Sequence, residues 1–144
     1  VPCGLACRDT LRLEAGMPLY GHELTTQTFP SQAGLGRVVS FKKESDFVGR
    51  SALEARDESG DRVLVGLAGE GRRAARAGYA VKDAAGTEVG IVTSGILSPT
   101  LGHPIALAYV EASQAEVGTE LNADVRGKPL PMTVVDLPFY TRSR

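Results

Sequence analysis

The pattern of apolar and polar positions changes character near residue 60. Beyond it, six short apolar or alternating runs are separated by turn-forming residues, a pattern typical of β-strands. The expected strands span residues 62–68, 78–82, 87–94, 105–111, 120–126 and 130–137. Because no helical segment interrupts these runs, they predict a small antiparallel β-barrel or sandwich.

Two turn sequences join consecutive strands of this second part. Residues 83–86 (Asp-Ala-Ala-Gly) predict a tight hairpin between the second and third strands. Residues 127–129 (Gly-Lys-Pro) predict another between the fifth and sixth. Ahead of the strands, the polar stretch 57–61 (Asp-Glu-Ser-Gly-Asp) is the best candidate for a linker.

The first part of the chain mixes helix and strand signals. Alternating apolar positions at 11, 13 and 15 suggest a strand, but good helix formers followed by Gly16 and Pro18 favour a short helix over residues 8–16. On such a helix Arg8 and Arg12 share one face, since they are four residues apart. We further expect a loop over 21–31, a strand over 35–41 and a short helix over 50–57.

Composition narrows the class of protein. The 144 residues are 42% hydrophobic and 23% charged, as in an ordinary globular chain. A net charge of −1 argues against a strongly basic nucleic-acid binder, and no apolar run approaches the roughly 18–20 residues of a membrane-spanning helix. Residue 1 is Val rather than Met, so we expect a piece of a longer protein.

Few residues have the spacing of a catalytic or metal site. Cys3 and Cys7 are too few for a disulfide framework or a four-ligand zinc site, and His22 and His103 are isolated. We interpret the cysteines as small, semi-buried thiols. The segment 92–99 contains two serines near His103 but no nucleophile elbow, which argues against a hydrolase.

The arginines are more informative. Residues 70–76 (Glu-Gly-Arg-Arg-Ala-Ala-Arg) place three arginines in one loop, either as solvated charges or as contacts to a carboxylate or phosphate. The same question applies to Arg8 and Arg12, because Asp9 and Glu14 offer pairing partners within the chain. The residues alone leave both alternatives open.

Several motifs in order along the chain resemble the glycine cleavage system T-protein, the aminomethyltransferase family. Residues 4–21 (Gly-Leu-Ala-Cys-Arg-Asp-Thr-Leu-Arg-Leu-Glu-Ala-Gly-Met-Pro-Leu-Tyr-Gly) carry the strongest similarity, with a cysteine at position 7 where the family commonly has alanine. Residues 46–53, 92–101, 105–110 and 137–139 are similar to later family motifs. The resemblance covers the whole chain.

The resemblance implies an α+β fold class: a short α/β remnant of a middle domain followed by an antiparallel β-barrel of six to seven strands. Residues 1–57 would be the C-terminal portion of a middle, folate-binding domain, and residues 58–144 the C-terminal barrel. The implied reaction transfers a one-carbon unit from the aminomethyl-lipoyl H-protein to tetrahydrofolate and releases ammonia. The implied location is the bacterial cytoplasm or, in a eukaryote, the mitochondrial matrix.

The resemblance also assigns site residues. Arg8 matches the family arginine that contacts folate, a role that suits a planar donor fork. A second folate contact is expected near the C-terminus, with Arg142 preferred over Arg144 and Tyr140. Asp9 and Glu14 are expected to be helix and pairing residues, and Arg76, at the family's barrel entry, is expected to be structural. The family's catalytic aspartate belongs to an N-terminal domain, so we expect no catalytic residue, no metal site and no transferase activity in this chain alone.

Two other functions remain open from the sequence. One is a folate-dependent relative of the sarcosine or dimethylglycine oxidase or demethylase type. The other is a non-catalytic module that binds folate or a partner protein. A piece of a larger enzyme would also expose apolar surface, from which we expect self-association.

Overall fold

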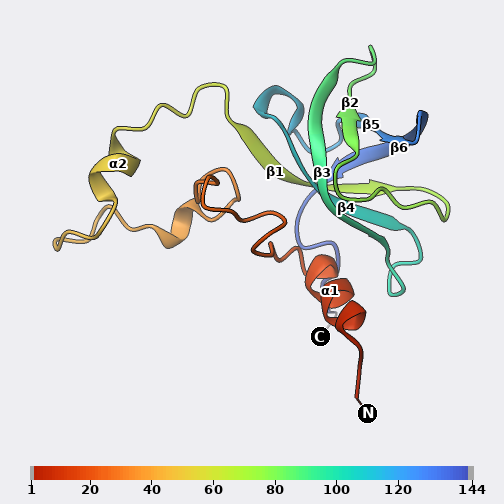
Figure 1. The fold of residues 1–144 in the computed structure, drawn as a ribbon, viewed down its shortest axis with the longest axis horizontal. Coiled ribbons are helices and arrows are strands. Elements are labelled where there is room, and N and C mark those ends of the chain that lie inside the picture. The colour runs from red at the N-terminus through yellow and green to blue at the C-terminus, as the bar shows by residue number, and fades with distance from the viewer. Residues whose placement is uncertain (1, 143–144) are drawn as a thin grey trace.

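The structure is a computed structural model that describes residues 2–142. Its elements, in chain order, are α1 (Leu5–Glu14), η1 (Gly36–Val38), α2 (Arg50–Glu54), β1 (Arg62–Gly69), β2 (Ala80–Lys82), β3 (Glu88–Leu97), β4 (Pro104–Glu111), η2 (Ala112–Gln114), β5 (Glu120–Val125) and β6 (Lys128–Val135). In Figure 1 the strands gather on one side, α1 lies beneath them and α2 lies on the far side of an extended segment. None of the helices in residues 2–142 has the length and apolar character needed to cross a membrane.

The six strands form a closed antiparallel barrel in the order β1-β4-β3-β2-β5-β6. Closure leaves no unpaired edge, which suits strands as short as three residues. Alternate side chains fill the interior with small and branched residues, including the fully buried Leu67, Val81 and Ala106. The predicted α+β barrel fold is therefore confirmed, and so is each of the six expected strands.

A β-bulge in β3 changes which side chains face outward. The register against β4 shifts between Val92 and Ser94, so Thr93 is an extra residue on this strand. Val92 points into the barrel core, whereas Ser94 pairs with Leu107, which belongs to the cluster outside that core. Without the bulge, strict alternation would send Ser94 inward. The bulge thus turns a hydroxyl toward the face that α1 covers.

The helix α1 packs on this outer face through Leu13. That side chain is fully buried against Ile105 and Leu107 of β4. The helix ends where Gly16 adopts a positive φ of 66° and donates its backbone N–H to the carbonyl of Leu13, a common C-terminal cap. The predicted stop is confirmed, while the helix begins three residues earlier than expected. Its N-cap, Gly4, contributes no side-chain hydrogen bond that the sequence could signal.

Three local expectations need correction. The predicted strand over 35–41 is wrong, because only the short 3-10 helix η1 forms there. Val38 and Phe41 are exposed, and none of these residues pairs with a strand. The helix expected over 50–57 forms but ends at Glu54. The last hairpin turn is Arg126–Gly127 rather than 127–129, since Val125 pairs directly with Lys128. The loop at 21–31 and the hairpin at 83–86 form as expected.

Candidate functional site

The carboxylate of Glu14 fixes the end of α1 to the barrel. It accepts hydrogen bonds from the Ser98 hydroxyl, the Thr100 hydroxyl at 2.8 Å and the Thr100 backbone N–H at 3.2 Å. Burial alone would raise the pKa of Glu14, but these donors outweigh burial and hold the pKa below its ordinary value. The side chain is therefore an ionised anchor at neutral pH.

A second buried carboxylate, Glu23, comes from the loop after α1. Its oxygens accept hydrogen bonds from the Ser94 hydroxyl at 2.5 Å and the Leu19 backbone N–H at 2.9 Å. The side chain is fully buried, which by itself would raise the pKa of Glu23; the donors and the nearby charge of Arg12 lower it below the ordinary value. In addition, the Tyr109 hydroxyl donates to the Glu23 carbonyl at 2.9 Å.

Arg12 connects these groups. Its Nη1 lies 2.8 Å from Glu23 Oε2, its Nη2 donates to Ser94 Oγ at 2.8 Å, and its Nε donates to Asp9 Oδ1 at 2.8 Å. The guanidinium also donates to the Met17 carbonyl at 3.2 Å. These contacts occupy its donor fork and leave its side chain only 10% exposed. Arg12 is thus a structural residue, and the predicted pairing of Asp9 within the chain is confirmed.

Arg8 differs from Arg12 although both line the same cavity. The cavity has a volume of about 320 Å³ and is bounded by seven residues: Leu5, Ala6, Arg8, Asp9, Arg12, Leu19 and His22. Within residues 2–142, Arg8 takes part in no ion pair or side-chain hydrogen bond, and it is exposed. An exposed guanidinium beside an apolar wall can bind a carboxylate or phosphate without giving up an existing contact.

An adjoining cavity of about 270 Å³ extends this site onto the barrel. It shares Asp9 and His22 with the first cavity and adds Arg76 and residues 93–95 of β3. The ring of His22 lies with Nδ1 3.3 Å from the Thr93 carbonyl and 3.4 Å from Ser94 Oγ. Two cavities therefore meet at the junction between α1 and the barrel, and each is lined by at least one arginine.

The expected C-terminal contacts are not gathered beside Arg8. Arg142 is exposed on the tail after β6 and lines neither of these two cavities. Tyr140 bonds to α1 through its backbone, where its N–H donates to the Glu14 carbonyl at 2.9 Å, and it lines neither cavity. Arg144, the other alternative, lies outside the described residues.

The cysteines occupy the start of α1. Both Cys3 and Cys7 are exposed, so the interpretation as semi-buried thiols is wrong. Burial is prevented because this end of the helix projects beyond the barrel (Figure 1). In the described part of the chain, no group of three or more potential metal-ligating side chains is present.

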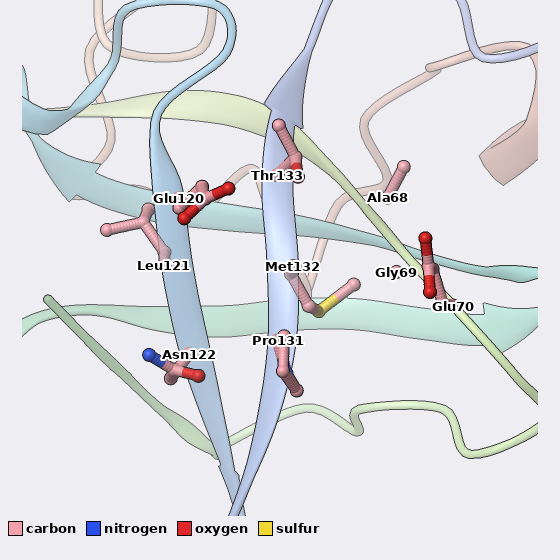
Figure 2. A pocket seen from close by; sticks show the side chains of 9 residues that line it. All are labelled: Ala68, Gly69, Glu70, Glu120, Leu121, Asn122, Pro131, Met132 and Thr133. Atoms are coloured by element: carbon pink, nitrogen blue, oxygen red, sulfur yellow. The ribbon is translucent and has the colours of Figure 1, made fainter. Parts of the chain in front are cut away.

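A larger depression lies on the barrel wall and is less suited to recognition. Figure 2 shows it between β1 and the β5–β6 hairpin, with Glu70 and Glu120 on opposite sides. Its volume is about 630 Å³, yet all its lining residues come from the barrel strands and the residue after β1, and none is basic. Two exposed carboxylates without a buried polar group define no ligand site here.

Sequence reasoning missed the residues that organise the site. Glu23 was part of an expected loop, His22 was considered isolated, and Ser94 belonged to a segment with no assigned role. Each gains its role through contacts across more than 70 residues of sequence, which no local pattern signals. The i,i+4 spacing of Arg8 and Arg12 predicts that both lie on one face of the helix, and in the structure both line one cavity.

The fold and site together define a small closed β-barrel domain that carries a helical segment with an arginine-lined cleft. Residues 62–141 match the glycine cleavage T-protein C-terminal barrel domain, and residues 1–43 match the GCVT N-terminal domain. The chain belongs to the glycine cleavage T-protein family.

Similar proteins support the same assignment. An aminomethyltransferase from Cutibacterium acnes is 74% identical over 99% of this chain and 38% of the relative's length. One from Saccharopolyspora erythraea is 59% identical over 99% of this chain and 39% of its own. The crystal structure of glycine cleavage system aminomethyltransferase T from Bartonella henselae superposes with a TM-score of 0.87 at 38% identity, covering 95% of this chain and 39% of that one. The chain therefore spans well under half the length of these relatives.

Proposed function

We propose that this chain is the C-terminal part of an aminomethyltransferase. The whole enzyme would transfer a one-carbon unit from the aminomethyl group on the lipoyl arm of the H-protein to tetrahydrofolate and release ammonia. The names of the relatives support the transferase, and the exposed arginine of α1 supports folate binding. We place the reaction in the bacterial cytoplasm, or in the mitochondrial matrix for a eukaryotic enzyme.

We propose that the chain contributes to two domains of the whole enzyme. Residues 1–57 would belong to the middle, folate-binding domain and residues 58–144 to the C-terminal barrel. Matches that end at residue 43 and begin again at residue 62 support a boundary between them. Because the chain covers 38–40% of its relatives, we propose that it does not catalyse the reaction alone and that the catalytic aspartate lies elsewhere in the whole enzyme.

The observation that carries the folate proposal is the contrast between Arg8 and Arg12. Arg12 is paired with Glu23, whereas Arg8 lines a cavity of about 320 Å³ and has no ion-pair partner among residues 2–142. Folate combines a flat ring system with a glutamate carboxylate tail. Leu5 and Leu19 offer apolar surface for the former, and the Arg8 fork would hold a carboxylate of the latter. Bound tetrahydrofolate would supply the acceptor for the one-carbon unit.

A binding experiment on the 144-residue chain tests this role. We expect the Arg8→Ala variant to bind tetrahydrofolate about tenfold more weakly or worse in calorimetry, since it loses a charge-assisted contact. Arg37→Ala, on the exposed η1, removes the same charge away from the cavity and should bind as the parent does. Equal affinities for Arg8→Ala and the parent would overturn the folate role. Arg142→Ala in the same assay tests the weaker C-terminal candidate.

The reaction itself requires the full-length parent. With aminomethylated H-protein and tetrahydrofolate it should form methylenetetrahydrofolate and ammonia, whereas the 144-residue chain should form neither. A folded parent that gives no product would rule out the transferase. A flavin domain upstream in the parent would favour an oxidase-type relative, and H-protein binding without folate binding would favour a non-catalytic module.

A further inference from the structure

A basic cleft lies between the loop that joins β1 to β2 and the β5–β6 hairpin. No α1 residue lines it, although Arg76 also lines the adjoining cavity that includes Asp9. Its volume is about 420 Å³. Four cationic side chains line it, Arg73 and Arg76 from the loop and Arg126 and Lys128 from the hairpin. The remaining lining residues are Ala74, Tyr79 and Val125, so the lining contains no carboxylate. Four like charges converge here in a chain whose net charge is −1.

No acidic side chain among residues 2–142 forms an ion pair with these four cations. The one side-chain hydrogen bond that they make within that range is a long contact of 3.5 Å from Arg76 to the Gly95 carbonyl. The acid nearest in sequence on the hairpin, Asp124, already binds Lys82 at 2.7 Å and the Gly127 backbone N–H at 2.7 Å. A cleft lined by one sign of charge attracts ions of the opposite sign.

The loop that carries two of the arginines is anchored rather than loose. Ala75, between Arg73 and Arg76, is fully buried in the barrel core. It packs so closely on β3 that a Cβ atom at Gly95 would lie 2.4 Å from the Ala75 carbonyl oxygen. The neighbouring arginines therefore start from a fixed backbone, which lowers the entropic cost of binding a ligand.

The hairpin presents its arginine from an unfavourable backbone conformation. Arg126 has a φ of 56° and Gly127 a φ of 78°, so the two-residue turn needs left-handed geometry at both positions. Asn, Asp and Gly are the residues preferred at the first position of such a turn, because they adopt a positive φ readily. Arginine is not among them. Residues held in such conformations concentrate at ligand sites. Arg126 therefore contributes a positive charge to the cleft while making the hairpin turn less stable than Asn would.

We propose that this cleft binds a small multivalent anion that carries at least two phosphate or carboxylate groups. Three guanidinium forks and one ammonium can bind several anionic oxygens at once, and guanidinium matches both groups in geometry. The volume lies within the roughly 300–1,000 Å³ of small-molecule sites. This proposal does not depend on the folate proposal, because neither Arg8 nor any other α1 residue lines the cleft.

The test is calorimetric titration of the 144-residue chain with tripolyphosphate and, separately, with citrate. We expect saturable binding of one anion per chain that weakens as salt is added. Arg126→Asn should lower the affinity about tenfold or more by removing one fork. The same substitution should raise the melting temperature, since Asn suits the turn better, so loss of binding cannot be attributed to unfolding. Arg73→Gln should also lower the affinity for the anion, but it should not raise the melting temperature.

Controls separate the alternatives. Arg37→Asn removes the same charge on η1 and should leave anion binding within twofold of the parent. Arg8→Ala should also leave it unchanged, so that failure of this site and failure of the folate site are distinguishable. Binding of only one of the two probes would identify phosphate or carboxylate as the ligand group. The proposal would be overturned if the parent and Arg126→Asn bound the anions equally. It would also be overturned if the chain bound a hexaglutamate peptide but neither small anion.

Discussion

Arg12 and Glu23 form a buried ion pair, with Arg12 Nη1 2.8 Å from Glu23 Oε2. This pair joins α1 to the loop that follows it along the chain. The Ser94 hydroxyl completes the arrangement by donating to Glu23 and accepting from Arg12. One helix residue, one loop residue and one barrel residue are thereby held together. Arg8, one turn earlier on the helix, takes no part in this attachment and forms no ion pair or side-chain hydrogen bond within residues 2–142.

Glu23→Gln should destabilise the chain strongly. The substitution keeps the shape of the side chain but leaves the Arg12 guanidinium, with its side chain only 10% exposed, without its buried counter-charge. We expect the free energy of unfolding to fall by about 3–5 kcal/mol, the range for breaking one half of a buried pair. Urea unfolding followed by circular dichroism measures it.

A matched substitution at an exposed pair provides the control. Glu58 approaches Arg56 at 3.6 Å with 64% of its side chain exposed. Glu58→Gln should change the free energy of unfolding by less than about 0.5 kcal/mol. If both substitutions had equal effects, the Arg12–Glu23 pair would not be the attachment point of α1.

Stability should fall in acid because of Glu14 and Glu23. Burial alone would raise each pKa, but donors hold both below the ordinary value, so the folded state binds fewer protons than the unfolded state. Their contribution is complete above the ordinary glutamate pKa and is lost as the pH falls through the lower folded pKa. The free energy of unfolding should therefore decline from about pH 5 downward. Glu14→Gln should flatten this decline, and an unchanged profile would contradict the assignment.

The barrel was predictable because its register repeats. Apolar and polar residues alternate along a strand when one of its faces packs in a closed core. Residues 83–86 have the residue types that a hairpin turn needs. The strand expected over 35–41 failed for the complementary reason. Val38, Val39 and Phe41 are apolar, but strand formation requires a partner edge. The closed barrel offers none, and residues 35–41 pair with no strand.

The site was predictable only where local spacing decides it. Arg8 and Arg12 share a face by helix geometry, but which of them remains available depends on Glu23. That contact needs the loop after α1 and a bulge in β3 that turns Ser94 outward. A bulge adds one residue to a strand without a distinctive sequence, so the hydroxyl could not be assigned from the pattern.

Gly90→Ala should destabilise the barrel although it adds only one methyl group. A Cβ atom there would lie 2.3 Å from the Tyr109 carbonyl oxygen on the adjacent strand β4. The strands would have to separate, at a cost of about 1–3 kcal/mol or more. Gly36→Ala is the control, since its nearest neighbour lies at 3.7 Å. Thermal unfolding should show a lower midpoint for the first variant only; equal midpoints would mean that β3 and β4 can move apart freely.

The isolated chain should self-associate through apolar side chains of its first part. Val38 and Val48 are 74% and 105% exposed, and both lie before the barrel, in a region with little core of its own. Exposed apolar surface of this kind favours association. Light scattering should show an apparent mass that rises above 15.2 kDa with concentration. The double variant Val38→Ser and Val48→Ser should reduce the rise, whereas Val117→Ser, on the exposed β4–β5 connection, should not. A monomeric mass at every concentration would contradict the prediction.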